Sequence, residues 1–189
     1  MAASVLYMSI SLDGYVAGPD EAPGNPLGDG GYRLHDWVLG GPADKINDQV
    51  RAECEAAGAI VAGRGTFEPA EGWGGDHHNG VPIFILSRQP QPDWTKDWPL
   101  VHYGNDLDGA FSSAREAAGD KTVLVHGAAV AQRAIRAGLL DELELHLVPV
   151  LLGGGRRLFD HIGVQQRELE RIRVLEGDGV THLHFRIRH

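Results

Sequence analysis

The sequence predicts an α/β protein with a mixed, mainly parallel sheet and helices on both faces, formed by residues 1–189 as a single domain. Apolar β-type runs alternate with helical patterns over most of the chain, an order that produces parallel strand pairs. The last third differs, because Leu143, Leu145 and Leu147 alternate with polar residues. A two-residue period of this kind is typical of antiparallel strands with one wetter face.

The first element is a strand over residues 4–11, which ends at the turn signal Asp13-Gly14. Residues 17–36 follow and are rich in Gly, Pro and Asp. So long a stretch without regular structure is usually a binding loop, so we expect a lid that borders the ligand pocket and is more mobile than the next helix. Tyr32 and Trp37 provide apolar groups with which it can dock.

A helix is predicted over residues 42–57. Pro42 suits the first helical position. The apolar residues share one face of this helix and recur at helical spacing. They are Ile46, Val50, Cys54 and Ala57. Gly58 is expected to cap the helix.

The remaining elements follow from the same two periodicities. Strands are expected at 59–62, 82–86, 100–103 and 122–126, and helices at 107–118 and 128–137. Strands over 141–148 and 180–188 complete the sheet and are expected to pair antiparallel, because Glu144 and His146 on the first complement His182, His184 and Arg186 on the second.

Composition narrows the class of protein. The hydrophobic content of 42% is ordinary for a folded protein, and a net charge of −9 argues against a nucleic-acid binder. The single cysteine, Cys54, rules out an intrachain disulfide and a cysteine-based zinc cluster. The N-terminus resembles a strand rather than a signal peptide, and no apolar run is long enough to span a membrane. We therefore expect a cytoplasmic protein without a membrane partner.

Two strand-glycine-helix junctions are the main functional signal. One passes from the strand at 59–62 through Gly63 and Arg64, and the other passes from the strand at 122–126 through Gly127. The start of a helix presents unpaired backbone N–H groups at the positive end of its dipole, which favours anions. Two such junctions suit a ligand with two separated phosphates, such as a phosphorylated dinucleotide.

Five short motifs, in order along most of the chain, resemble the dihydrofolate reductase fold and, more specifically, the reductase domain of bacterial riboflavin biosynthesis and its small stand-alone relatives. They are Met8-Ser9-Ile10-Ser11-Leu12-Asp13-Gly14-Tyr15-Val16-Ala17, Gly63-Arg64-x-Thr66-Phe67-Glu68, Leu86-Ser87, the run from Val125 to Leu143, and Pro149-x-Leu151-Leu152-Gly153-x-Gly155-x-x-Leu158-Phe159. The resemblance implies a dihydrofolate reductase-like three-layer sandwich.

The same resemblance implies NADPH as cofactor. Gly63, Arg64 and Thr66 would lie by the adenosine 2′-phosphate and pyrophosphate. Ser87 and Arg88 would lie beside the adenine and the ribose phosphate, and Ala17 near the nicotinamide. The pyrophosphate would be held at the second junction, by His126, Gly127, Ala128, Ala129 and Val130. The family commonly has Gly-Gly where this chain has His126-Gly127, so the histidine side chain would crowd the cofactor or contribute a contact of its own.

The implied function is NADPH-dependent hydride transfer to a small heterocyclic or ribose-phosphate substrate, as in 5-amino-6-(5-phosphoribosylamino)uracil reductase, in a homodimer. A dihydrofolate or pterin reductase and a non-catalytic nucleotide or flavin binder remain alternatives. The riboflavin enzyme is often fused to a zinc deaminase, which needs a Cys-x-x-Cys pair. One cysteine therefore limits this chain to the reductase half.

Proton supply and metals complete the expectations. Asp13 is the candidate catalytic carboxylate because it follows the first strand, where ligand-facing groups of α/β sheets lie, and its alternative role is in the turn. Asp36 and Asp48 are the other candidates. No metal is expected, since zinc needs three or four ligands and a polar sheet face explains the alternating histidines. Arg156-Arg157 could meet a substrate phosphate or start a helix.

Overall fold

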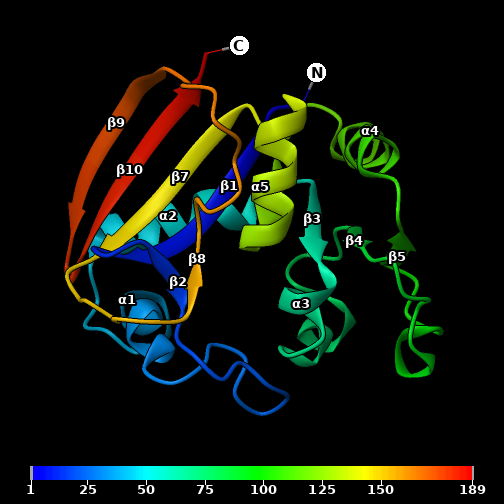
Figure 1. Cartoon of the computed structure of the whole chain (residues 1–189), viewed down its shortest axis with the longest axis horizontal. Helices are drawn as coiled ribbons and strands as arrows, with labels where there is room; N and C mark the ends of the chain where they lie inside the picture. Colours follow the sequence, from blue (N-terminus) through cyan, green and yellow to red (C-terminus); the bar gives the residue numbers. More distant parts are fainter. Residues whose placement is uncertain (1, 189) are drawn as a thin grey trace.

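The computed structural model describes residues 2–188, and its centre is an eight-stranded sheet with the strand order β5-β4-β3-β6-β1-β7-β10-β9 (Figure 1). The strands are β1 (Ser4–Ser11), β3 (Ala59–Gly63), β4 (Ile83–Leu86), β5 (Val101–Gly104), β6 (Val123–His126), β7 (Glu142–Val148), β9 (Leu169–Gly177) and β10 (Val180–Ile187). From β5 to β7 the neighbours are parallel, and β10 is antiparallel to both β7 and β9. The predicted mixed, mainly parallel sheet is confirmed.

Helices cover both faces of the sheet, which confirms the three layers (Figure 1). The helices are α1 (Asp36–Leu39), α2 (Lys45–Glu55), α3 (Arg64–Phe67), α4 (Leu107–Ala118) and α5 (Ala128–Ala137), with 3-10 turns η1 (Gly31–His35), η2 (Glu71–Gly75) and η3 (Asp93–Thr95). On one face, α4 and α5 pack against Val123 and Val125 of β6. Leu124, between them in the strand, points to the other face and joins Cys54 of α2 in a second cluster.

The helix predicted at 42–57 is shorter than expected. It begins at Lys45 because the carboxylate of Asp44 accepts hydrogen bonds from the backbone N–H groups of Ile46 and Asn47, each at 2.9 Å. Pro42 therefore precedes the helix rather than opening it. Gly58 also lies beyond the helix end, and its lack of a side chain lets it pack closely on the backbone of Ala118.

The antiparallel pairing of β7 with β10 is confirmed in register, with His146 opposite His182 and Glu144 opposite His184. The expectation that this polar face is wet is wrong. Glu144, His146 and His182 are all buried, at 6%, 0% and 1% exposure. The face is dry because α2 and Trp37 cover it, with the Trp37 ring 4.7 Å from that of His146.

The segment expected to be a structureless lid has regular parts. Its first residue, Ala17, belongs to a short strand, β2 (Tyr15–Ala17), which pairs with β8 (Arg156–Arg157). The same segment later forms η1 and the first residue of α1. The pair Arg156-Arg157 therefore lies in a strand and does not start a helix.

The first strand lies inside the sheet rather than at an edge. Ser4 of β1 is in register with Val123 of β6, and on the other side Val5 is in register with Glu142 of β7. Both neighbours run parallel to β1 and come from the second half of the chain. This arrangement brings the carboxyl ends of β1 and β6 together, at the edge of the sheet where the candidate site lies.

Candidate functional site

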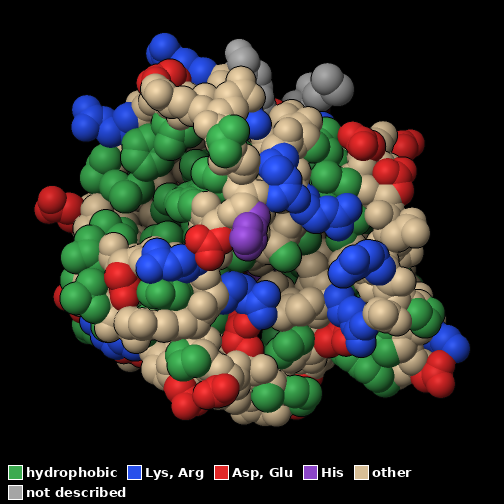
Figure 2. Space-filling view, viewed as in Figure 1, with side chains coloured by type: hydrophobic (Ala, Val, Ile, Leu, Met, Phe, Trp, Pro, Cys, Tyr) green, Lys and Arg blue, Asp and Glu red, His purple; other side chains and the backbone are tan. Residues whose placement is uncertain are grey.

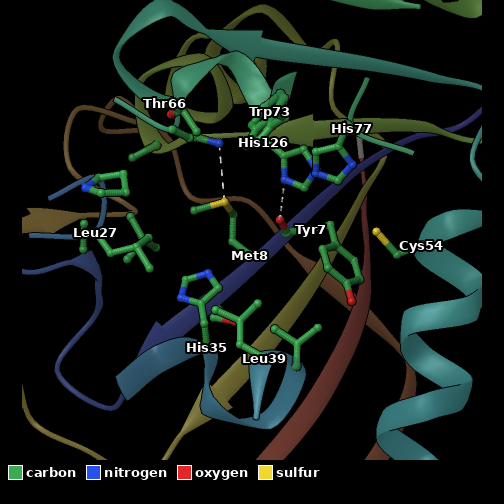
Figure 3. A pocket seen from close by; sticks show the side chains of 18 of the residues that line it. Tyr7, Met8, Leu27, His35, Leu39, Cys54, Thr66, Trp73, His77 and His126 are labelled. Carbon is green, nitrogen blue, oxygen red and sulfur yellow. Dashed lines mark hydrogen bonds between the residues drawn. The ribbon is translucent and has the colours of Figure 1, made fainter. Parts of the chain in front are cut away.

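A cavity of about 490 Å³ opens at the carboxyl ends of β1 and β6, between the lid segment and η2 (Figure 3). Glu21, Pro26, Leu27 and His35 of the lid segment line it together with Gly127. The expectation that this segment borders the pocket beside the second junction is confirmed.

Five of the residues expected to bind the cofactor line this cavity. They are Ala17, Thr66, His126, Gly127 and Ala128. The other residues of the expected set lie outside the lining. They are Gly63, Arg64, Ser87, Arg88, Ala129 and Val130. The second junction thus opens directly on the cavity, whereas the first faces it mainly through Thr66.

Gly127 is the N-terminal cap of α5 and has a φ of 98°, a conformation that favours glycine. A Cβ atom here would lie 2.2 Å from Oγ1 of Thr66, so the two junctions are in close contact at this point. The helix that follows has ten residues, and its first-turn N–H groups have no partner within the helix. An anion at this edge would meet these donors at the positive end of the helix dipole.

The side chain of His126 points away from the backbone of Gly127 and toward Tyr7 of the neighbouring strand β1 (Figure 3). Its Nδ1 lies 3.1 Å from the carbonyl oxygen of Tyr7. A carbonyl only accepts, so Nδ1 carries the proton and Nε2 is a bare lone pair. Burial lowers the pKa of His126 to about 3, which keeps the ring neutral. The histidine therefore packs on His77 without crowding Gly127.

The first junction lies one strand further along the same edge. Gly63 at the end of β3 is in register with Leu86 at the end of β4, so the residues that follow them, Arg64 and Ser87, leave the sheet at neighbouring points. Arg64 is 44% exposed, and its Nε donates to Glu68 at 2.7 Å. The Ser87 hydroxyl instead donates to the Gln89 carbonyl oxygen in a local turn.

The last three expected cofactor residues differ in surroundings. Arg88 and Ala129 are exposed, and Ala129 is in the first turn of α5. Val130 is 2% exposed and belongs to the core, where its Cγ2 packs against Gly63. Val130 thus joins the two junctions by packing, and only its backbone can face a ligand.

Asp13 is not among the residues that line the cavity. Its carboxylate accepts hydrogen bonds from the Ser11 hydroxyl at 2.6 Å and from the backbone N–H groups of Leu152 and Gly153 at 3.1 and 2.7 Å. These bonds, the one from Ser11 foremost, lower the pKa of Asp13 to about 2. The structure therefore gives Asp13 the turn role, and its expected catalytic role gains no support from this geometry.

The other two candidate carboxylates also lie outside the cavity lining. Asp36 is 60% exposed and pairs with Arg33, and Asp48 is 55% exposed and pairs with Arg51. Both carboxylates therefore face solvent rather than the cavity.

The sequence patterns missed most of the cavity wall, which is aromatic. Tyr7 comes from β1, Trp37 from α1, and Trp73 and His77 from η2 and the loop after it. Trp73 packs against His77 and His126, with ring centroids 4.7 and 5.9 Å apart (Figure 3). The only available signal was the presence of tryptophans within glycine-rich segments.

Among residues 2–188, no three His, Cys, Asp or Glu side chains are grouped closely enough to hold a metal ion. His77 and His78 are in contact through their Nδ1 atoms at 2.8 Å, so one of them donates to the other. Nor does this part of the chain contain a helix long and apolar enough to cross a bilayer.

Residues 4–183 match the family model of the RibD C-terminal domain. No curated protein sequence matches the chain. Among solved structures, a protein from Shewanella sp. PV-4 named for riboflavin biosynthesis is 23% identical, with a TM-score of 0.73 and 99% of each chain covered. A pyrimidine reductase-like protein from Corynebacterium diphtheriae is 16% identical, with a TM-score of 0.65, and the match covers 100% of this chain and 92% of that one.

Longer proteins share the fold as well. A diaminohydroxyphosphoribosylaminopyrimidine deaminase/5-amino-6-(5-phosphoribosylamino)uracil reductase from Thermotoga maritima is 14% identical with a TM-score of 0.65, and the match covers 99% of this chain and 57% of that one. RibD from Acinetobacter baumannii gives the same TM-score, and 59% of it is covered. The chain thus spans somewhat more than half the length of these two proteins.

Proposed function

The chain belongs to the RibD C-terminal domain family, within the dihydrofolate reductase-like superfamily, and on that premise we propose that it is an NADPH-dependent reductase of a small heterocyclic substrate. The reaction would resemble that of the 5-amino-6-(5-phosphoribosylamino)uracil reductase named in the Thermotoga maritima relative.

The observation that carries the proposal is the order of the expected cofactor residues along one edge of the sheet. Neighbouring strands β4, β3, β6 and β1 end there in that order. Ser87 follows β4, Arg64 follows β3 and Gly127 follows β6. NADPH has the same sequence of groups: a phosphorylated adenosine, a pyrophosphate and a nicotinamide. In this order Ala17, which lines the cavity, would be the residue beside the nicotinamide.

The residues present fit this cofactor. A glycine is required where α5 starts, and the absence of a side chain leaves the first-turn N–H groups open to a pyrophosphate. Arg64 and Arg88 supply the cations that a 2′-phosphate needs. When bound, the nicotinamide supplies the hydride.

The protein's own contribution is to orient the reactants and to exclude water. The aromatic wall and the lid segment line a largely apolar cavity, in which water is displaced by a bound ring. His126 and His77 are neutral there, because burial lowers the pKa of His77 to about 4. Neutral imidazoles accept or donate hydrogen bonds without adding charge near the hydride path.

Anaerobic assays that follow the loss of NADPH absorbance with 5-amino-6-(5-phosphoribosylamino)uracil, its dephosphorylated form and dihydrofolate test the proposal. Turnover of an aminouracil supports it. Faster turnover of dihydrofolate would favour the pterin alternative. That alternative needs a buried carboxylate in the site, and Asp13 does not line the cavity. Tight NADPH binding without turnover of any compound would favour the non-catalytic binder.

We also propose a homodimer, formed through the outer face of β10 and β9. Hydrophobic side chains gather over these strands (Figure 2). Val174 of β9 is 43% exposed and lies opposite the half-buried Leu183. Arg171 and Glu176 flank Val174, so a two-fold axis there pairs opposite charges from two copies of one surface. Val174→Asp should halve the mass measured by light scattering, whereas Val164→Asp, at a fully exposed site, should not.

The proposed compartment is the cytoplasm. Cys54 is a free, buried thiol, which is compatible with a reducing compartment.

A further inference from the structure

The cavity lining has no net charge and no unpaired cation. It includes two arginines, Arg51 and Arg156, and two glutamates, Glu21 and Glu55. Arg156 donates to Glu21 through Nε at 2.6 Å and also through Nη2. Arg51 is bound through Nη2 to Asp48 at 2.9 Å. A phosphate entering the cavity would have to compete with Glu21 for Arg156 or with Asp48 for Arg51, which weakens the attraction of either guanidinium for it.

The rest of the wall favours a flat, uncharged ring. Tyr7, Trp37 and Trp73 provide aromatic surface. Met8 and Leu27 provide flexible apolar surface (Figure 3). Burial raises the pKa of Tyr7 and so keeps its hydroxyl protonated. Burial lowers the pKa of each of the lining histidines, which disfavours the positive charge that would attract an anion; they are His35, His77, His78 and His126.

One polar group in this wall has a proton to give. The indole Nε1–H of Trp37 donates to Oγ of Ser9 at 3.0 Å. An indole N–H only donates, so Ser9 accepts here and keeps its own hydroxyl proton. Within residues 2–188 no acceptor receives that proton, although Ser9 is only 5% exposed and lines the cavity. A buried hydroxyl in this position gains by donating to a ligand.

We propose that the cavity binds an uncharged planar heterocycle, that Ser9, held by Trp37, donates its hydroxyl proton to a ring carbonyl or ring nitrogen, and that the site makes no productive contact with a substrate phosphate. The inference rests on the proposed function for the choice of ring. It departs from the substrate named for the Thermotoga maritima relative, which carries a phosphate.

Calorimetry measures the dissociation constants of 5-amino-6-(ribosylamino)uracil and of its 5′-phosphate under anaerobic conditions. Each compound is titrated into the protein alone and into the protein with NADP⁺. A phosphate held by one free arginine adds about tenfold or more in affinity. We expect the two dissociation constants to agree within about threefold. Tenfold tighter binding of the phosphate, or no binding of either compound, overturns the proposal. Because no turnover is measured, this result is independent of the NADPH assay that tests the proposed function.

A variant tests the charge argument directly. Glu21→Gln releases Arg156, so the 5′-phosphate should then bind about tenfold more tightly than the unphosphorylated compound. Glu170→Gln is the matched control, because it removes the carboxylate of an ion pair with Arg188 outside the cavity. An unchanged ratio in Glu21→Gln would show that Arg156 cannot reach the ligand and would remove this part of the proposal.

The role of Ser9 is separated from that of Trp37 by two substitutions. Ser9→Ala should weaken binding of the unphosphorylated ring by about three- to tenfold, the value of one neutral hydrogen bond. Trp37→Phe removes the same internal hydrogen bond but leaves the Ser9 hydroxyl in place, so its loss should be smaller. Equal losses in both variants would mean that Ser9 only positions the indole, and no loss in Ser9→Ala would exclude the hydroxyl as a donor. Thermal melts of both variants confirm that they fold.

Discussion

Replacing Arg64 by alanine should weaken NADPH binding and leave NADH binding nearly unchanged. NADPH has a ribose 2′-phosphate that NADH lacks, and an arginine at a helix start can grip a phosphate through parallel N–H···O bonds. Within residues 2–188 the hydrogen bond of Arg64 is made by Nε to Glu68. The terminal nitrogens, Nη1 and Nη2, are therefore the ones that would meet the phosphate.

The size of the loss follows from the surroundings of Arg64. A hydrogen bond to a charged group typically contributes about 1.5–3 kcal/mol, or ten- to a hundredfold in affinity. Arg64 is 44% exposed and already paired with Glu68, so solvent and the carboxylate both weaken its attraction for a phosphate. We therefore expect a loss near the lower end, about tenfold.

Quenching of tryptophan fluorescence, titrated with both nucleotides, measures the effect. Glu68→Gln is the complementary variant, because it frees Arg64 and should tighten NADPH binding. Its structural cost is small, since within residues 2–188 the only other hydrogen bond that the Glu68 carboxylate accepts is a long one, 3.3 Å, from Tyr103. Equal losses for NADPH and NADH in Arg64→Ala would mean that Arg64 acts through the pyrophosphate or through folding. No loss for either nucleotide would refute its role in cofactor binding.

Three further predictions concern stability. Gly127→Ala should cost about 1–3 kcal/mol of unfolding free energy in urea titrations, because φ is 98° and the new Cβ meets Thr66, and Thr66→Ala should recover part of the loss. Asn47→Ala should cost about 1–3 kcal/mol of unfolding free energy, because it leaves the buried Nε2–H of His182, now 2.9 Å from Oδ1 of Asn47, without an acceptor. The control Asp48→Ala, at an exposed neighbouring position, should cost under about 1 kcal/mol, and equal losses in the two variants would contradict the prediction. The pKa of His126 is lowered from 6.5 to about 3 in the folded protein, so between these pH values the unfolded state binds more protons than the folded state. The stability that the neutral His126 contributes is therefore fully present above pH 6.5 and is lost as the pH falls. The urea midpoint of His126→Gln should therefore fall less than that of the wild type between neutral pH and about pH 4.5, and parallel curves would contradict the shift.

The strands and helices of the parallel region could be predicted because their periodicity reflects local burial. Helix 107–118 was placed correctly, as was the antiparallel pairing of the last strands. The wet face was wrong because alternation shows only that two faces differ. Whether histidines such as His146 meet solvent depends on α2 and Trp37, which come from elsewhere in the chain. Strand β9 was missed because as an edge strand it is mostly exposed and has no clean alternation.

The candidate site likewise has a part that the sequence predicts and a part that it does not. The start of α5 at Gly127 could be predicted because the strand, the glycine and the helix are consecutive in sequence. The cavity wall could not, since Tyr7, Trp37 and Trp73 lie in three separate segments that meet only in the folded chain. The pairing of Arg156 with Glu21 likewise spans 135 residues and leaves no local signal.

The interior position of β1 has a consequence for synthesis on the ribosome. Its partners, β6 and β7, begin at Val123 and Glu142, so the first strand leaves the ribosome long before either neighbour exists. At translation rates of 5–20 residues per second, β1 stays without sheet partners for on the order of ten seconds. Its apolar side chains and open backbone edges are then a template for unwanted association. Nascent chains that stop before β7 should therefore be chaperone-bound or aggregated, and release should coincide with the emergence of Val148.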